Sequence, residues 1–144
     1  MKKKKYTDAS QKNKSGQILE EQTEKILREF GHKYTRQKSG PNKVAIDFIV
    51  ETQHGNLYLE CKNQNGPGSV YEKIPHTLFK YKEKYDFSEW YVIRGRKPIP
   101  KLIYDNLDFL RTCWTPNVET HIITLDELPN LLTQKPIHRS VFVA

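Results

Sequence analysis

The sequence has few cysteines and no long hydrophobic run. Its 144 residues include two cysteines, Cys61 and Cys113, which are too few for a disulfide-rich scaffold and indicate a reducing compartment. No apolar stretch approaches the ~20 residues that a membrane span requires. A secretory signal has an apolar stretch after its basic residues. The lysine-rich start of this sequence is not followed by one, so it differs from such a signal. We expect a cytoplasmic protein that has no membrane partner.

Acidic residues are fewer than basic residues. The chain has 24 lysines and arginines against 17 aspartates and glutamates, which gives a formal net charge of +7. Such a basic surplus most often indicates that the partner is a nucleic acid. Residues 1–14 contain six lysines and one aspartate, so five of the seven net charges lie there. Because this segment lacks apolar periodicity, we expect a flexible basic tail, which is either a solvated tail or an arm that contacts phosphates.

Residues 15–144 are expected to form a single domain. Hydrophobic residues make up 36% of the chain and aromatic residues 11%, which is enough for a core at this length. The pattern predicts helices at 16–30, 70–85, 101–110 and 126–132, and strands at 34–36, 44–50, 57–62, 90–94 and 121–125. Pro75 must begin or break its helix, and Pro129 interrupts the last one. This order indicates an α/β fold with a small mixed central β-sheet flanked by helices.

Strands 44–50 and 57–62 form a hairpin signal, with the turn at residues 54–55 or 55–56. Side chains alternate between the two faces of a strand, so an even-length turn places Asp47, Glu60 and Lys62 on one face, together with Tyr58. With a two-residue turn at 54–55, position 47 lies opposite position 62. The other face is wholly apolar and belongs against a helix. Its residues are Ile46, Phe48, Val50, Leu57, Leu59 and Cys61.

Two carboxylates and a lysine that converge in this way favour metal chemistry. Carboxylate oxygens are the ligands that Mg²⁺ prefers, and a bound Mg²⁺ lowers the pKa of its water and neutralises charge on a phosphate. Lys62 would orient or deprotonate that water, or stabilise the developing charge. Positioned acid–base catalysis alone accelerates a reaction by only roughly 10²- to 10⁴-fold, so we expect the metal to contribute most of the rate acceleration. The alternative is that the three residues are solvated charges on an exposed strand face.

The same residues resemble a known family. Ile46-Asp47 … Glu60-Cys61-Lys62 resembles the Asp … (Asp/Glu)-x-Lys signature of the PD-(D/E)XK nuclease superfamily. This superfamily includes restriction endonucleases and archaeal Holliday junction resolvases. Ile46 stands where the family has a proline, which is not a ligand, so the implied chemistry is unaffected.

The first predicted helix carries a second part of the resemblance. Gly16, Glu20 and Gly31 reproduce the spacing found in the first helix of the resolvases. The resemblance implies that Glu20 is a ligand of the metal or of its water. Glu21 and Glu24 are neighbouring alternatives for this role.

The resemblance implies a restriction-endonuclease-like fold and Mg²⁺-dependent hydrolysis of DNA, which leaves 5′-phosphate and 3′-hydroxyl ends; Mn²⁺ can substitute. Asp47, Glu60 and the Cys61 carbonyl would hold the metal, and Lys62 would activate or orient the attacking water. Because so small a chain has one active site, cleavage of a duplex requires a homodimer, a higher homo-oligomer or a partner subunit. The expected setting is intracellular, in a prokaryote or a phage.

The expected DNA contacts are polar and basic side chains after the predicted hairpin and in the tail. They are Gln64, Ser69, Tyr71, Lys73, Arg94, Arg96, Lys97, Lys2, Lys3, Lys4 and Lys5. For Ser69 the alternative is a helix cap, and for the cations at 94–97 it is a solvated turn.

Residues 68–75 resemble a segment that follows the active-site strand in some type II restriction enzymes, which favours restriction-type cleavage of both strands. Junction resolution and strand nicking are the alternatives within the superfamily. A non-catalytic DNA-binding module is the alternative from another class. No histidine has zinc-like spacing, and no phosphate-cradling loop for nucleotide hydrolysis is present.

Overall fold

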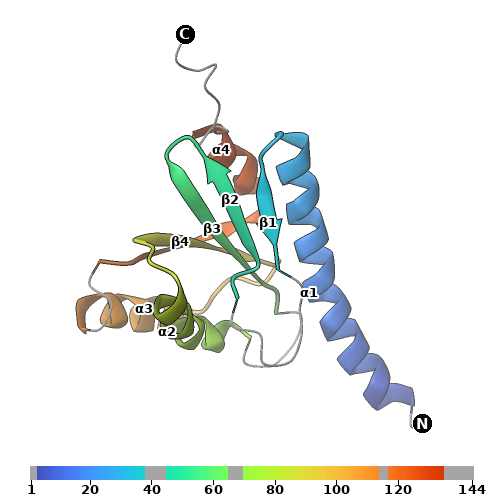
Figure 1. Ribbon diagram of the computed structural model, residues 1–144. Coiled ribbons are helices and arrows are strands. Elements are labelled where there is room, and N and C mark those ends of the chain that lie inside the picture. Colours follow the sequence, from blue (N-terminus) through green and yellow to red (C-terminus); the bar gives the residue numbers. More distant parts are fainter. Residues whose placement is uncertain (1–2, 38–44, 65–69, 114–116, 135–144) are drawn as a thin grey trace.

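A five-stranded mixed sheet with helices on both faces forms the structure. The computed structural model describes residues 3–37, 45–64, 70–113 and 117–134, with side chains of the first helix from Gly16 onward. The elements are α1 (Lys3–Glu29), β1 (Tyr34–Arg36), β2 (Phe48–Thr52), β3 (Gly55–Lys62), η1 (Tyr71–Lys73), α2 (Ile74–Lys84), β4 (Glu89–Arg94), α3 (Lys101–Cys113), β5 (Glu119–Thr124), η2 (Leu125–Glu127) and α4 (Leu128–Gln134). All five predicted strands and the α/β fold class are confirmed (Figure 1).

The strands lie in the order β1-β2-β3-β4-β5. The pairs β1–β2 and β2–β3 are antiparallel, whereas the pairs β3–β4 and β4–β5 are parallel. Helix α2 connects β3 to β4 and α3 connects β4 to β5, as parallel neighbours require crossovers. The three parallel strands therefore end at the same edge of the sheet.

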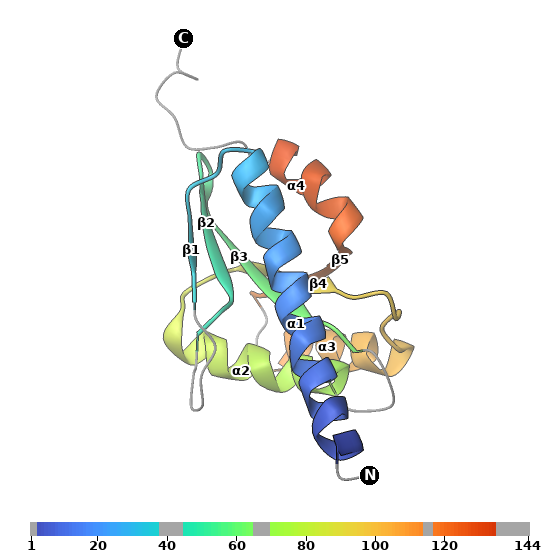
Figure 2. The same cartoon turned by 90° about the vertical axis from the view of Figure 1, so that its right-hand side faces the viewer.

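Each face of the sheet is buried against its own pair of helices (Figure 1, Figure 2). Leu19 and Leu27 of α1 and Leu128 and Leu132 of α4 pack with Phe48 and Leu59 on one face. Side chains of α2 and α3 pack around Trp90 on the other. Full burial of one such large apolar side chain contributes about 1.5–3 kcal/mol. Among the described residues, no helix combines the length and the apolar character needed to cross a membrane.

The hairpin closes one residue earlier than predicted. Thr52 pairs with Gly55, so the two-residue turn is Gln53-His54. The Thr52 hydroxyl donates to the Gly55 carbonyl at 2.7 Å and accepts from His54 N at 3.2 Å. The register consequently pairs Phe48 with Leu59, which brings Asp47 next to Glu60 rather than opposite Lys62. Because the shift is two residues, the predicted faces are preserved for the residues that lie inside β2 and β3.

Two predicted boundaries and one predicted side-chain face were wrong. Helix α1 begins at Lys3 instead of residue 16, so most of the expected tail is helical. No glycine or proline interrupts residues 1–15, and lysine has good helix propensity, so the helix extends without an apolar stripe. Strand β2 begins at Phe48, after a bend at Asp47. Ile46 lies before that bend and packs against α2 and α3, not with Phe48 on the α1 face.

Glycine and proline act largely as predicted. Gly31 ends α1 with φ 72°, and His32 N donates to Leu27 O at 3.1 Å, as in a Schellman C-terminus. Pro75 lies in the first turn of α2 and begins the helix. Pro129 also lies in the first turn of α4, so it does not interrupt that helix as predicted.

Candidate active site

Asp47, Glu60 and Lys62 meet where the chain enters β2 and leaves β3. Asp47 N donates to Glu60 Oε1 at 3.1 Å, and Cys61 N donates to Asp47 Oδ2 at 2.9 Å. Lys62 Nζ lies 3.4 Å from Glu60 Oε2. Glu60 is only 3% exposed, so the alternative of solvated charges on an open strand does not hold for this residue. The sequence-predicted trio is thus brought together by one hairpin.

Burial dominates the electrostatics of Glu60. It raises the pKa of the carboxyl from 4.5 to about 8; the Asp47 charge adds to this effect and the Lys62 charge opposes it. The Tyr81 oxygen lies 2.7 Å from Glu60 Oε2 and 3.0 Å from Ala45 O. A tyrosine hydroxyl has one hydrogen for these two acceptors. Both contacts are satisfied when Glu60 is protonated and donates to Tyr81, which in turn donates to Ala45.

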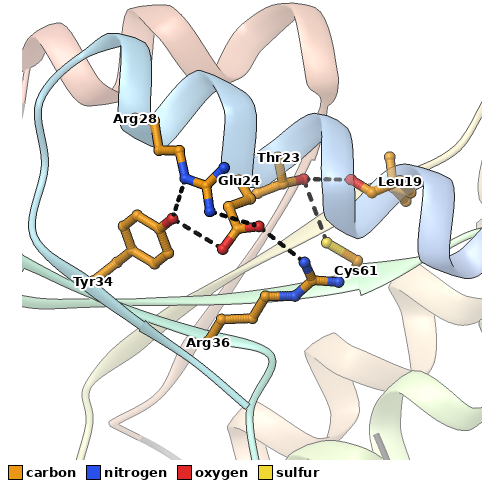
Figure 3. A network of polar contacts seen from close by, with 7 residues as sticks. All are labelled: Leu19, Thr23, Glu24, Arg28, Tyr34, Arg36 and Cys61. Atoms are coloured by element: carbon orange, nitrogen blue, oxygen red, sulfur yellow. Dashed lines mark hydrogen bonds and ion pairs between the residues drawn. The ribbon is translucent and has the colours of Figure 1, made fainter. Parts of the chain in front are cut away.

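The helix that passes the site offers three glutamates. Glu24 accepts from Tyr34 at 2.9 Å and Arg36 at 3.0 Å and pairs with Arg28 at 3.5 Å (Figure 3). Burial alone would raise the pKa of Glu24, but the hydrogen bonds from Tyr34 and Arg36 and the two guanidinium charges lower it. Glu24 is therefore engaged in joining α1 to β1.

Among the three glutamates, Glu20 is the one whose charge acts on a residue of the hairpin. Its charge acts on the Cys61 thiol, and its side chain is half-buried, whereas Glu21 is exposed. Thr23, one turn along, donates to Leu19 O at 2.8 Å and lies 3.5 Å from Cys61 Sγ (Figure 3). This contact joins α1 to β3 between Glu60 and Lys62.

Cys61 can serve the site only through its backbone. Burial raises the pKa of the thiol well above its ordinary value, and the Asp47 charge raises it further, so the sulfur stays protonated. The N–H of Cys61 points at Asp47. In a strand the N–H and C=O of one residue point to the same side, so the carbonyl is directed there as well.

The predicted DNA contacts have different environments. Tyr71 is 2% exposed and its hydroxyl donates to Lys97 O at 2.7 Å, so this prediction was wrong and Tyr71 is a core residue. Gln64 Oε1 accepts from Tyr71 N at 3.2 Å. Arg94 donates to the carbonyls of Gly95, Arg96 and Lys97, which shapes that turn.

The remaining predicted contacts are exposed, lie at the start of α1 or fall outside the residues that the structure describes. Lys73, Arg96 and Lys97 are exposed. Lys3, Lys4 and Lys5 lie in the first turns of α1, and Ser69 and Lys2 lie outside the described residues.

A groove of about 690 Å³ lies at the carboxyl ends of β3, β4 and β5, and its lining includes Asn63, the residue after Lys62, but not Asp47, Glu60 or Lys62. Its lining comes from α1 and from the turns after these strands: Ile18, Leu19, Gln22, Asn63, Arg94, Gly95, Arg96, Thr124, Leu125 and Asp126. A Cβ on Gly95 would collide with the Asn63 side chain, so Asn63 packs directly on this turn. Sequence reasoning missed Asn63, Gln22 and Thr124. These residues could have been predicted from the rule that ligands bind outside the carboxyl ends of parallel strands.

The fold and the site together define a class. A helix-flanked mixed sheet that joins an aspartate, a glutamate and a lysine across one hairpin is the framework of a nuclease of the Asp … Glu-x-Lys type. Comparison with protein-family models matches residues 11–97, more than half of the chain, to the PD-(D/E)XK nuclease superfamily domain. The chain belongs to the PD-(D/E)XK nuclease superfamily, whose nucleases generally use a divalent metal ion. No curated protein and no solved structure matches it.

Proposed function

We propose that the protein is a Mg²⁺-dependent endonuclease that hydrolyses phosphodiester bonds of duplex DNA in the manner of type II restriction enzymes, as a homodimer or with a partner subunit. The observation that carries the proposal is the joined Asp47–Glu60 pair with Lys62 Nζ 3.4 Å from Glu60. The donor set suits a hard divalent cation because it has two carboxylates that contact the same hairpin backbone and a backbone carbonyl between Glu60 and Lys62. The products would carry 5′-phosphate and 3′-hydroxyl ends.

Asp47, Glu60 and the Cys61 carbonyl would hold the ion, and Glu20 would act through a water molecule. When bound, Mg²⁺ (or Mn²⁺ in its place) neutralises charge on the phosphate and makes its water more acidic. Glu60 must first release its proton, after which the Tyr81 hydroxyl can donate its hydrogen bond to the carboxylate. Lys62, with 21% of its side chain exposed, can reach both the attacking water and the phosphate.

The proposed DNA path runs from the groove at the carboxyl ends of β3, β4 and β5 along exposed cations. Lys73, Arg96 and Lys97 are exposed, and Arg94 and Arg96 line the groove. Because such contacts go to phosphates, they would position the duplex without reading its sequence. The helical start of α1 would add a basic arm that carries five of the seven net charges.

The proposed reaction is tested with supercoiled plasmid in Mg²⁺ or in EDTA. Asp47→Asn keeps an oxygen for the Cys61 N–H but loses the ligand charge, so cleavage should fall on the order of 10³-fold, since a metal supplies several kcal/mol. Asp105→Asn, at an exposed ion pair on α3, is the matched control and should cut normally.

Three other outcomes separate the alternatives. Asp47→Asn cutting at the wild-type rate would contradict the proposal. A wild-type protein that binds DNA but cuts no form of it with Mg²⁺ or Mn²⁺ would be a binding module. Cleavage confined to a cruciform plasmid would instead indicate junction resolution.

Removal of the basic arm is a separate prediction. Deletion of residues 2–14 should weaken DNA binding and flatten its salt dependence, because each lost phosphate contact lowers the log–log slope by about 0.9. Cutting at saturating DNA should not change, since Glu20 and the hairpin remain. The measurement is a salt titration of binding for both proteins. Identical titrations would mean that the segment is a solvated extension.

A further inference from the structure

A second group of ligand-type side chains lies far from the candidate active site. Glu89 begins β4, and Glu119 and His121 lie on β5, which pairs with β4 in parallel. Glu89 precedes Val92, the partner of Glu60, by three residues, a separation of about 10 Å along the strands. Glu89 shares the α1/α4 face with Tyr91, whereas Glu60 points toward α2. The group is therefore at the other end and on the other face of the sheet.

Strand pairing fixes the three side chains next to one another. Glu89 is paired with Glu119, and Tyr91 with His121. His121 Nε2 lies 3.1 Å from Glu89 Oε2 and 3.6 Å from Glu119 Oε2. Ligands bound to Zn²⁺ at 2.0–2.1 Å in a tetrahedron lie about 3.3 Å apart. The two histidine–carboxylate separations bracket this value, and the three donor atoms all lie within 4.8 Å of one another, so the group is close to the spacing of a metal site.

Tyr91 orients two of the three side chains. Its ring stacks on the His121 ring with centroids 4.6 Å apart and an interplanar angle of 21°. Burial raises the pKa of the tyrosine, and the charges of Glu89 and Glu119 and a hydrogen bond with Glu89 raise it further. An aromatic support of this kind holds ligands in place, as outer partners do in metal sites.

The arrangement carries an electrostatic cost that a cation would remove. Two glutamates directly opposite on adjacent strands repel each other. Their side chains and that of His121 are 36–59% exposed, so a cation can reach them from solvent. An imidazole with two carboxylates suits Zn²⁺ and similar transition metals, whereas Mg²⁺ prefers oxygen ligands alone.

We infer that Glu89, Glu119 and His121 form a binding site for a transition-metal cation of the Zn²⁺ type, with three protein ligands and the fourth position open to solvent. This site is separate from the proposed Mg²⁺ site and does not depend on nuclease activity. The spacing of the histidines in the sequence did not reveal this site, because one of its three ligands, Glu89, comes from the neighbouring strand. The available signal was Glu119-x-His121, whose side chains share one face of a strand.

Calorimetric titration of the full chain with Zn²⁺ alone tests the site, with Asp47→Asn as the background so that the active-site carboxylates contribute less. One equivalent should bind. Adding His121→Ala should weaken binding by at least about tenfold, the loss that removal of even an outer partner can cause. Glu119→Gln should weaken Zn²⁺ binding as well. Because Glu119 is more exposed than His121, this variant still tests the site if the histidine variant fails to fold.

His54→Ala is the matched control, since His54 is exposed on the hairpin turn, and it should leave the titration unchanged. Equal affinities for the background protein and both ligand variants would overturn the inference. The absence of Zn²⁺ binding by the background protein would overturn it too, and would leave the three residues as an ion-paired surface group. Neither result would bear on DNA cleavage.

Discussion

Lys62→Met is expected to lower the rate of DNA cleavage by roughly 10²- to 10⁴-fold, the range that a positioned proton-transfer group supplies. The ammonium lies 3.4 Å from Glu60 and is partly exposed, so it can meet water and phosphate together. DNA binding should change little, because one charge is lost among many phosphate contacts. The measurement is single-turnover cleavage at saturating DNA and Mg²⁺, beside a binding titration.

Lys62→Arg distinguishes the two proposed roles of the lysine. A guanidinium keeps the positive charge but cannot be deprotonated, so it retains activity only if Lys62 acts through its charge. Lys33→Met is the matched control, because Lys33 is 86% exposed in a surface ion pair. A Lys62→Met protein that cuts at the wild-type rate would exclude Lys62 from the chemistry.

Glu60→Gln is expected to stabilise the metal-free protein at pH 8. We expect the stability of the wild type to fall as the pH rises from 4.5 to about 8, and the substitution should remove most of this fall. Between pH 4.5 and about 8 the folded protein keeps the Glu60 proton that the unfolded chain has released. Raising the pH therefore draws the equilibrium toward the unfolded state, and stability falls by up to about 1.4 kcal/mol per pH unit. Glutamine mimics the protonated carboxyl and can donate to Tyr81, so its stability should stay nearly constant.

Urea unfolding in EDTA at several pH values measures this difference. Glu83→Gln, at an exposed position of α2, is the control and should follow the wild type. Addition of Mg²⁺ at pH 8 should stabilise the wild type, because a ligand that binds only the folded state adds stability, and it should fail to stabilise Glu60→Gln. Parallel stability profiles for Glu60→Gln and the wild type would mean that Glu60 is already ionised at pH 5.

The site could be predicted from the sequence because its geometry is mostly local. Side-chain alternation alone places Glu60 and Lys62 on one face of β3. Despite a register error of two residues, Asp47, just before β2, still lies next to Glu60 and donates its N–H to that carboxylate. The same rule failed for Ile46, since it holds only inside a strand and the chain bends at Asp47. Tyr71 was misassigned because an isolated polar aromatic gives no sign of whether its hydroxyl meets solvent or a buried carbonyl.

By itself, the sequence determined the order of strands and helices, the end of α1 at Gly31 and the polar face of the hairpin. Each of these depends on residues a few positions apart, through backbone freedom and periodicity. The tertiary structure alone decided that Glu60 is buried against Tyr81, that Glu24 is engaged by Tyr34 and Arg36, and that His121 meets Glu89. These contacts join residues from different elements. Desolvation and charge pairing depend on which elements pack together, and only the folded chain brings them into contact.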